Sequence, residues 1–81
     1  MMEDEVAVLE MFYRDWRLNG EARDYSGRHV KAVADIRLLD WVDVGGALQS
    51  CLNRGWLSGS QERVRLTSEG IRVGMEHFAG A

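Results

Sequence analysis

Four polar side chains occur at helical spacing in the middle of the chain, and none of them is acidic. They are Gln49, Ser50, Asn53 and Arg54. Glutamine and asparagine amides can pair with adenine edges, and a guanidinium can pair with guanine or phosphate. Two further arginines, Arg63 and Arg65, alternate with apolar residues, so a strand would carry both on one side. This pattern predicts contacts with bases and phosphates.

A second group of cations precedes these residues. Arg28 and Lys31 lie near the expected start of a helix, where the helix dipole also favours a phosphate. Asp40 and Asp43 oppose this prediction because they stand where the helix carrying Gln49 would begin. Phosphates would repel them unless one pairs with Arg37 or accepts a hydrogen bond from cytosine.

Signatures of catalysis and of metal binding are missing from the sequence. It has no glycine-rich phosphate loop, no Gly-x-Ser-x-Gly and no His-Glu-x-x-His. His29 and His77 are far apart, and Cys51 is the only cysteine, which we expect to be a buried small hydrophobe. We therefore predict no enzymatic activity, no catalytic residue, no metal, no cofactor and no small-molecule ligand.

Hydrophobic periodicity predicts the elements that position these side chains. A first helix over 3–18 would bury one stripe of large residues and end at Asn19-Gly20. A second helix over 27–37 would be capped by Ser26, after a loop or brief strand ending at Tyr25. The stripes are Val6, Leu9, Tyr13 and Trp16 with Phe12 in the first helix, and Val30, Val33 and Ala34 in the second.

The third helix has two possible starts. Asp40 could cap a helix from Trp41 to Asn53 or Arg54. Trp41 would then lie on its buried stripe; the alternatives are that it covers the turn or contacts a partner. The glycine pair Gly45-Gly46 would weaken a helix that begins at Trp41. Either the helix begins later, near Val44, or the two glycines let another backbone come close. The helix would stop at Gly55 in either case.

A β-hairpin and a last helix are expected after Gly55. The strands are 56–58 and 63–66, with a turn at 59–61, and alternation leaves either Trp56 or Leu57 facing outward. An outward Trp56 could contact a partner. Thr67 or Ser68 would cap the last helix, whose apolar stripe is Ile71, Met75 and Phe78.

Composition limits the chain to one domain, residues 1–81. Apolar residues make up 46% and charged residues 28%, which is typical of a globular domain. The net charge is −3, and the cations are nine arginines and Lys31. No apolar run is long enough for a membrane span, and the acidic start is unlike a secretory signal, so we expect a cytoplasmic protein.

Three segments carry a resemblance to a known family. Ala47–Leu57 resembles the recognition helix and first wing strand of MarR-type and related bacterial winged-helix proteins, with Cys51 where a leucine is usual. Val64–Gly70 is similar to their second wing strand, which runs into Leu-Thr-x-x-Gly. Tyr25–Val30 resembles the start of their second helix. The likeness spans about residues 5–78, although the acidic and glycine-rich start of the third helix departs from the DNA-binding pattern.

The resemblance implies an α+β, mostly α fold: a winged helix-turn-helix with a three-helix core, a β-hairpin wing and a C-terminal helix. It implies a small DNA-binding protein that regulates transcription, with double-stranded DNA as partner. The alternative is a winged-helix module for protein–protein interaction or dimerisation that does not bind DNA. The first and last helices are the expected contacts of a homodimer.

Overall fold

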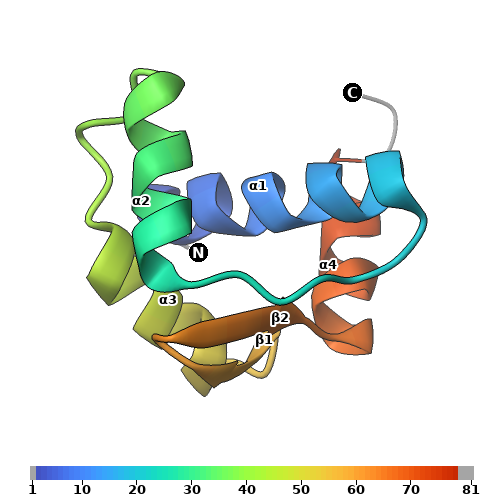
Figure 1. Cartoon of the computed structure of the whole chain (residues 1–81). Helices are drawn as coiled ribbons and strands as arrows, with labels where there is room; N and C mark the ends of the chain where they lie inside the picture. The colour runs from blue at the N-terminus through green and yellow to red at the C-terminus, as the bar shows by residue number, and fades with distance from the viewer. Residues whose placement is uncertain (1, 79–81) are drawn as a thin grey trace.

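The computed structural model describes residues 2–78 (Figure 1). Helix α1 crosses the middle of the molecule, with α2 and α3 at one end and α4 at the other, and the hairpin lies below it in this view. The elements are α1 (Glu3–Asn19), α2 (Gly27–Ile36), α3 (Val44–Asn53), β1 (Leu57–Ser60), β2 (Arg63–Leu66) and α4 (Ser68–Phe78).

Helix α1 supplies the largest share of the core. Its buried apolar residues are Val8, Leu9, Met11, Phe12 and Tyr13, whereas Val6 and Trp16 of the predicted stripe are only half-buried. The helix ends as predicted at Gly20, whose φ of 75° is left-handed and whose N–H donates to the carbonyl of Trp16.

Helix α2 begins and ends close to the predicted residues. The Ser26 hydroxyl accepts a hydrogen bond from the His29 N–H at 3.1 Å, which confirms the predicted cap. The helix ends at Ile36 without a glycine. Instead Leu38 takes the left-handed conformation with φ 61°, and the N–H of Leu39 donates to the carbonyl of Ala34 at 2.8 Å.

The later of the two predicted starts is correct for α3. Asp43 is the N-cap residue, and its carboxylate accepts from the Gly46 N–H at 3.2 Å. A Cβ at Gly46 would lie 2.4 Å from that carboxylate, so the glycine makes room for the cap. Because α3 begins at Val44, Trp41 lies in the preceding turn and is 55% exposed; its predicted core position was wrong.

The hairpin is confirmed with a shifted turn. Leu57 pairs with Leu66 and Ser60 with Arg63, so the connection is Gln61-Glu62 and not 59–61. Trp56 and Leu57 are both buried, which contradicts the prediction that one faces out. The alternation rule does not apply, because Trp56 precedes the strand and belongs to the turn that ends α3.

Tyr25 adds a single residue of pairing to the other edge of β2. Its N–H donates to the Val64 carbonyl at 2.8 Å, and the Val64 N–H returns a bond of 2.7 Å. Of the two predictions for this segment, the brief strand is the better description. The bridge fixes the α1–α2 connection against the hairpin.

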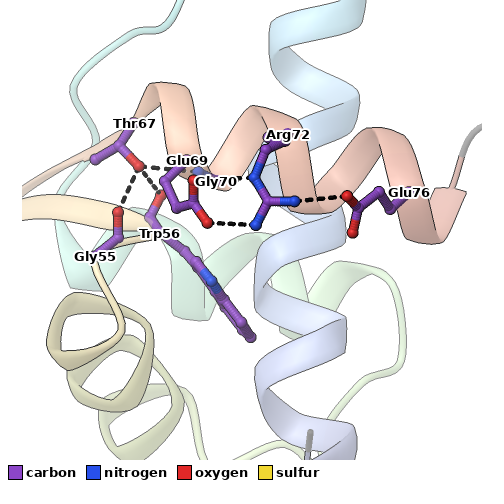
Figure 2. A network of polar contacts seen from close by, with 7 residues as sticks. All are labelled: Gly55, Trp56, Thr67, Glu69, Gly70, Arg72 and Glu76. Carbon is purple, nitrogen blue, oxygen red and sulfur yellow. Dashed lines mark hydrogen bonds and ion pairs between the residues drawn. The ribbon is translucent and has the colours of Figure 1, made fainter.

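The Leu66-Thr67-x-x-Gly70 segment joins the hairpin to α4 (Figure 2). The Thr67 hydroxyl accepts from the Gly70 N–H at 3.0 Å and lies 2.6 and 2.9 Å from the carbonyl oxygens of Gly55 and Trp56, to either of which it can donate. A Cβ at Gly70 would lie 2.1 Å from the Trp56 carbonyl oxygen. The motif therefore lets the start of α4 pass directly over the start of the hairpin.

Helix α4 buries a different face from the predicted one. Its buried residues are Gly70, Val73 and Gly74, whereas Ile71 and Phe78 are half-buried and Met75 is exposed. The two glycines explain the difference, since a Cβ at Gly74 would meet the Tyr13 ring at 2.4 Å. The small residues thus bring α4 close to α1.

These elements form a mostly helical α+β structure with a two-stranded antiparallel hairpin. The layout is compatible with a winged helix. Leu48, Cys51 and Leu57 pack with Val30 in one core cluster, as predicted, and Val33 packs at its edge. None of the helices within residues 2–78 has the length and apolarity needed to cross a membrane.

Candidate nucleic-acid interface

The exposed side of α3 is small and polar. Val44, Ala47, Leu48 and Cys51 face the core, which leaves Gly45, Gly46, Gln49 and Asn53 on the surface. The Gln49 side-chain N–H donates to the Asn53 side-chain oxygen at 3.0 Å. The Gln49 oxygen and the Asn53 NH2 remain available to an external ligand. Ser50, the third predicted polar contact, is half-buried.

A hollow separates this side of α3 from the hairpin. Gln49 and Asn53 line one wall, and residues 57–62 line the other. The register places Ser58 opposite Arg65 and Ser60 opposite Arg63, so these four residues share one face of the hairpin. The polar surface therefore continues from α3 across β1 to the two arginines on β2.

Arg63 and Arg65 point outward, as the burial of Val64 and Leu66 requires, but they share a counter-ion. Their Nε atoms lie 2.8 and 2.7 Å from the two carboxylate oxygens of Asp24. The hydrogen bonds from Arg65 and Arg63 hold the pKa of Asp24 below its ordinary value. The three side chains together keep one net positive charge.

Arg54 is tied to α1. Its Nε donates to the Glu5 carboxylate at 2.6 Å, and its guanidinium lies 5.0 Å from the centre of the Trp56 ring. The predicted contact with a base would have to compete with both of these interactions. The structure thus gives Arg54 a role in joining α1, α3 and the hairpin.

Glu5 is almost completely buried, and its carboxylate also accepts from the Met2 N–H at 3.0 Å. Burial raises the pKa of Glu5, but the hydrogen bonds from Arg54 and Met2 outweigh it, so the net pKa lies below the ordinary value. A charged carboxylate is therefore part of the folded structure at neutral pH.

The start of α2 holds the other two predicted cations. The Lys31 ammonium lies 3.0 Å from the Asp35 carboxylate, while Arg28 is exposed. Both line a hollow between the starts of α2 and α3 and the hairpin tip. The Gly27 N–H donates to the Gln61 carbonyl at 2.8 Å, so this helix end already uses part of its hydrogen-bonding capacity.

Gln61 at the hairpin tip holds the wing against the helices. Its side-chain N–H donates to the Gly45 carbonyl at 3.1 Å, and a Cβ at Gly27 would lie 2.9 Å from its backbone oxygen. The wing is therefore short and folded back. Sequence reasoning did not identify this contact, because a polar turn residue gives no signal of what it will contact.

Two acidic partners also went unidentified. Glu5 could have been found, since it lies four residues before Leu9 and so on the same helical face as the stripe. Asp24 could have been suspected only as a counter-charge for two adjacent outward arginines.

The two aspartates before α3 do not pair with Arg37. Within residues 2–78 neither Asp40 nor Asp43 forms an ion pair with it. Asp43 instead donates its backbone N–H to the Asp4 carboxylate at 2.9 Å.

A scan against protein-family models and searches of curated proteins and of solved structures found no match to this chain.

Proposed function

We propose that this chain is a small winged-helix protein that binds double-stranded DNA and regulates transcription, similar to MarR-type proteins. The observation that supports this best is the single polar surface from Gln49 and Asn53 on α3 to Arg63 and Arg65 on β2. It contains hydrogen-bonding groups that suit base edges beside cations that suit phosphates.

In this proposal α3 enters the major groove and the hairpin follows the backbone. The Gln49 and Asn53 amides contact base edges, while Arg28 and Lys31 contact phosphates. The ion pairs of Arg63 and Arg65 with Asp24 are exposed, and such pairs contribute only about 0–1 kcal/mol. A phosphate can therefore displace Asp24 from either guanidinium.

The second candidate is a module that binds protein and not DNA. It is favoured by the charge pattern, because Arg54, Arg63, Arg65 and Lys31 all lie in ion pairs with carboxylates of the same chain. Asp40 and Asp43 also remain at the start of α3, the end that would enter the groove.

An NMR titration of the 15N-labelled chain with a nonspecific DNA duplex at low salt distinguishes the two candidate functions. DNA binding predicts shifts confined to the amides of residues 28–31, 49–54 and 58–65. An absence of shifts at millimolar DNA excludes the first candidate, since nonspecific complexes form at about 10⁻⁴–10⁻⁶ M even at physiological salt.

A pair of double variants tests the role of the wing. Arg63→Ala with Arg65→Ala should weaken binding to all DNA sequences. It should also reduce the slope of log K against log salt concentration by about two or somewhat less. Arg14→Ala with Arg72→Ala removes the same charge from exposed sites on α1 and α4 and should leave the slope unchanged. Equal effects of both pairs would show that only net charge matters.

Dimerisation through α1 and α4 belongs to the same proposal. Helix α4 already covers Tyr13 of its own chain through Gly74, so a dimer contact would use the outer side of α4, where Met75 is exposed. The proposed site of action is the cytoplasm.

A further inference from the structure

The turn between α2 and α3 exposes three large apolar side chains within six residues. Ile36 is 80% exposed, Leu38 81% and Trp41 55%. We call these three residues the turn patch. In Figure 1 the turn lies at the end of the molecule opposite α4. Groups of exposed apolar residues on a small domain mark contact sites, whereas single ones do not.

The backbone conformation of Leu38 is a second, independent indication that the turn patch is a contact site. Leu38 has a φ of 61°, a conformation that costs leucine energy and glycine almost none. The Leu38 side chain gains almost nothing in return within the chain, because it is nearly fully exposed. The hydrogen bonds that end α2 hold Leu38 in this conformation, and residues held in this way cluster at functional sites. A contact outside the chain would give Leu38 the burial that the fold does not.

The charges beside the turn patch indicate what covers it. Asp35 is paired with Lys31, and the Asp43 carboxylate caps α3. Arg37 and Asp40 flank Leu38 and have no ion-pair partner within residues 2–78. One cation and one anion beside the same apolar patch make that surface complementary to itself.

We propose that two copies of the chain associate through their turn patches about a two-fold axis. In such a contact each residue meets the other copy's equivalent surface, so Arg37 of each copy can pair with Asp40 of the other. The apolar side chains of the two patches then cover one another. This interface is separate from α1 and α4 and does not depend on DNA binding.

The expected dimer is weak. Three side chains and their turn cover less than the roughly 800 Å² per partner of a stable interface. We therefore expect a dissociation constant between about 10 µM and 1 mM. Sedimentation velocity and 15N NMR dilution of the full chain over that concentration range should show a rising sedimentation coefficient. Amide shifts should change with concentration at residues 36–41.

Two substitutions locate the interface. Leu38→Asp should weaken association at least tenfold, and aspartate tolerates the left-handed conformation better than leucine, so folding is preserved. Ser58→Asp places the same charge on the exposed face of the hairpin, outside the turn patch and outside α1 and α4, and should leave association unchanged. A chain that stays monomeric up to about 1 mM, or one whose association is weakened by Met75→Asp on α4 and not by Leu38→Asp, overturns the proposal.

Charge exchange tests the two-fold arrangement. Arg37→Asp should weaken association because it places like charges opposite each other, and Arg37→Asp combined with Asp40→Arg should restore it. Restoration supports the pairing of Arg37 with Asp40 across the axis. If the double variant is as weak as the single one, the two-fold contact proposed here is wrong.

Discussion

Helices α2 and α3 end in the same kind of turn, but the tryptophan near each turn has a different environment. In both, the residue after the C-cap is left-handed, and the N–H of the next residue donates to the carbonyl five residues earlier, from Leu39 to Ala34 and from Trp56 to Cys51. This is the Schellman motif. At α3 the left-handed residue is Gly55 and the residue after it, Trp56, is buried. At α2 the left-handed residue is Leu38 and the residue after it, Leu39, is half-buried, but Trp41 two residues further on is exposed.

The difference lies in what each turn meets next. Trp56 directly precedes β1, and its carbonyl oxygen accepts from the Thr67 N–H and lies 2.9 Å from the Thr67 hydroxyl, so the start of α4 packs against its backbone (Figure 2). In the α2–α3 turn, Leu39 and Val42 pack inward, whereas Leu38 and Trp41 stay exposed. A local motif therefore fixes how a helix ends, while the neighbouring elements decide whether the residues after it are buried.

The largest difference in folding stability should be between variants of the two tryptophans. Trp56→Ala removes a buried aromatic ring and should destabilise the fold by about 3–5 kcal/mol. Trp41→Ala changes an exposed side chain and should stay within about 0.5 kcal/mol of the wild type. Urea unfolding followed by far-UV circular dichroism measures both. Similar losses would mean that the two turns are equally buried in solution.

The second-largest loss of folding stability should come from breaking the Glu5–Arg54 pair beside Trp56. Glu5→Gln weakens charged hydrogen bonds in a buried site and should cost about 1.5–3 kcal/mol at pH 7. Because the pKa of Glu5 is lowered in the fold, its stabilisation is complete above the unfolded value of about 4.3. It is lost as the pH falls through the lower native pKa.

Unfolding at several pH values checks this. The gap in stability between wild type and Glu5→Gln should be constant above about pH 5 and should narrow in acid. Asp40→Asn, which removes one charge from the α2–α3 turn, controls for the change in net charge. A gap that stays constant into acid would place the Glu5 carboxylate outside its pair with Arg54.

A smaller loss is expected at the junction that covers Trp56. Gly70→Ala places a methyl group against the Trp56 carbonyl, which must move, and overpacking of this kind costs about 1–3 kcal/mol. Gly45→Ala is the matched control, since a Cβ there has no neighbour closer than 4.0 Å, and alanine favours a helix. Thermal unfolding should separate the two variants by several degrees. Equal stability would contradict the close approach of α4 to the hairpin.

The sequence predicted the elements because periodicity and caps are local. Ser26, Gly20 and Gly55 mark helix ends by their own chemistry, and α2, α3 and the hairpin follow from spacing. Two predictions about burial were wrong: Trp41 is exposed, and Trp56 and Leu57 are both buried. The burial of a side chain depends on elements that pack against it from elsewhere in the chain, and spacing alone does not identify them. The candidate site was predicted as residue types on one surface. Its ion pairs, such as that of Arg54 with Glu5, join residues 49 positions apart and have no local signal.

The smallest effects test the two Schellman motifs directly by exchanging their left-handed residues. Gly55→Leu should destabilise by about 1–2 kcal/mol, because leucine is strained at a φ of 78°. Leu38→Gly should stabilise the monomer by up to about 1 kcal/mol, since the strain is relieved and no buried contact is lost. The gain is limited because glycine also has more freedom in the unfolded chain. Denaturant unfolding at low micromolar concentration, where association through the turn patch is negligible, measures both. A loss of stability on Leu38→Gly would show that the Leu38 side chain contributes to the monomer's own core.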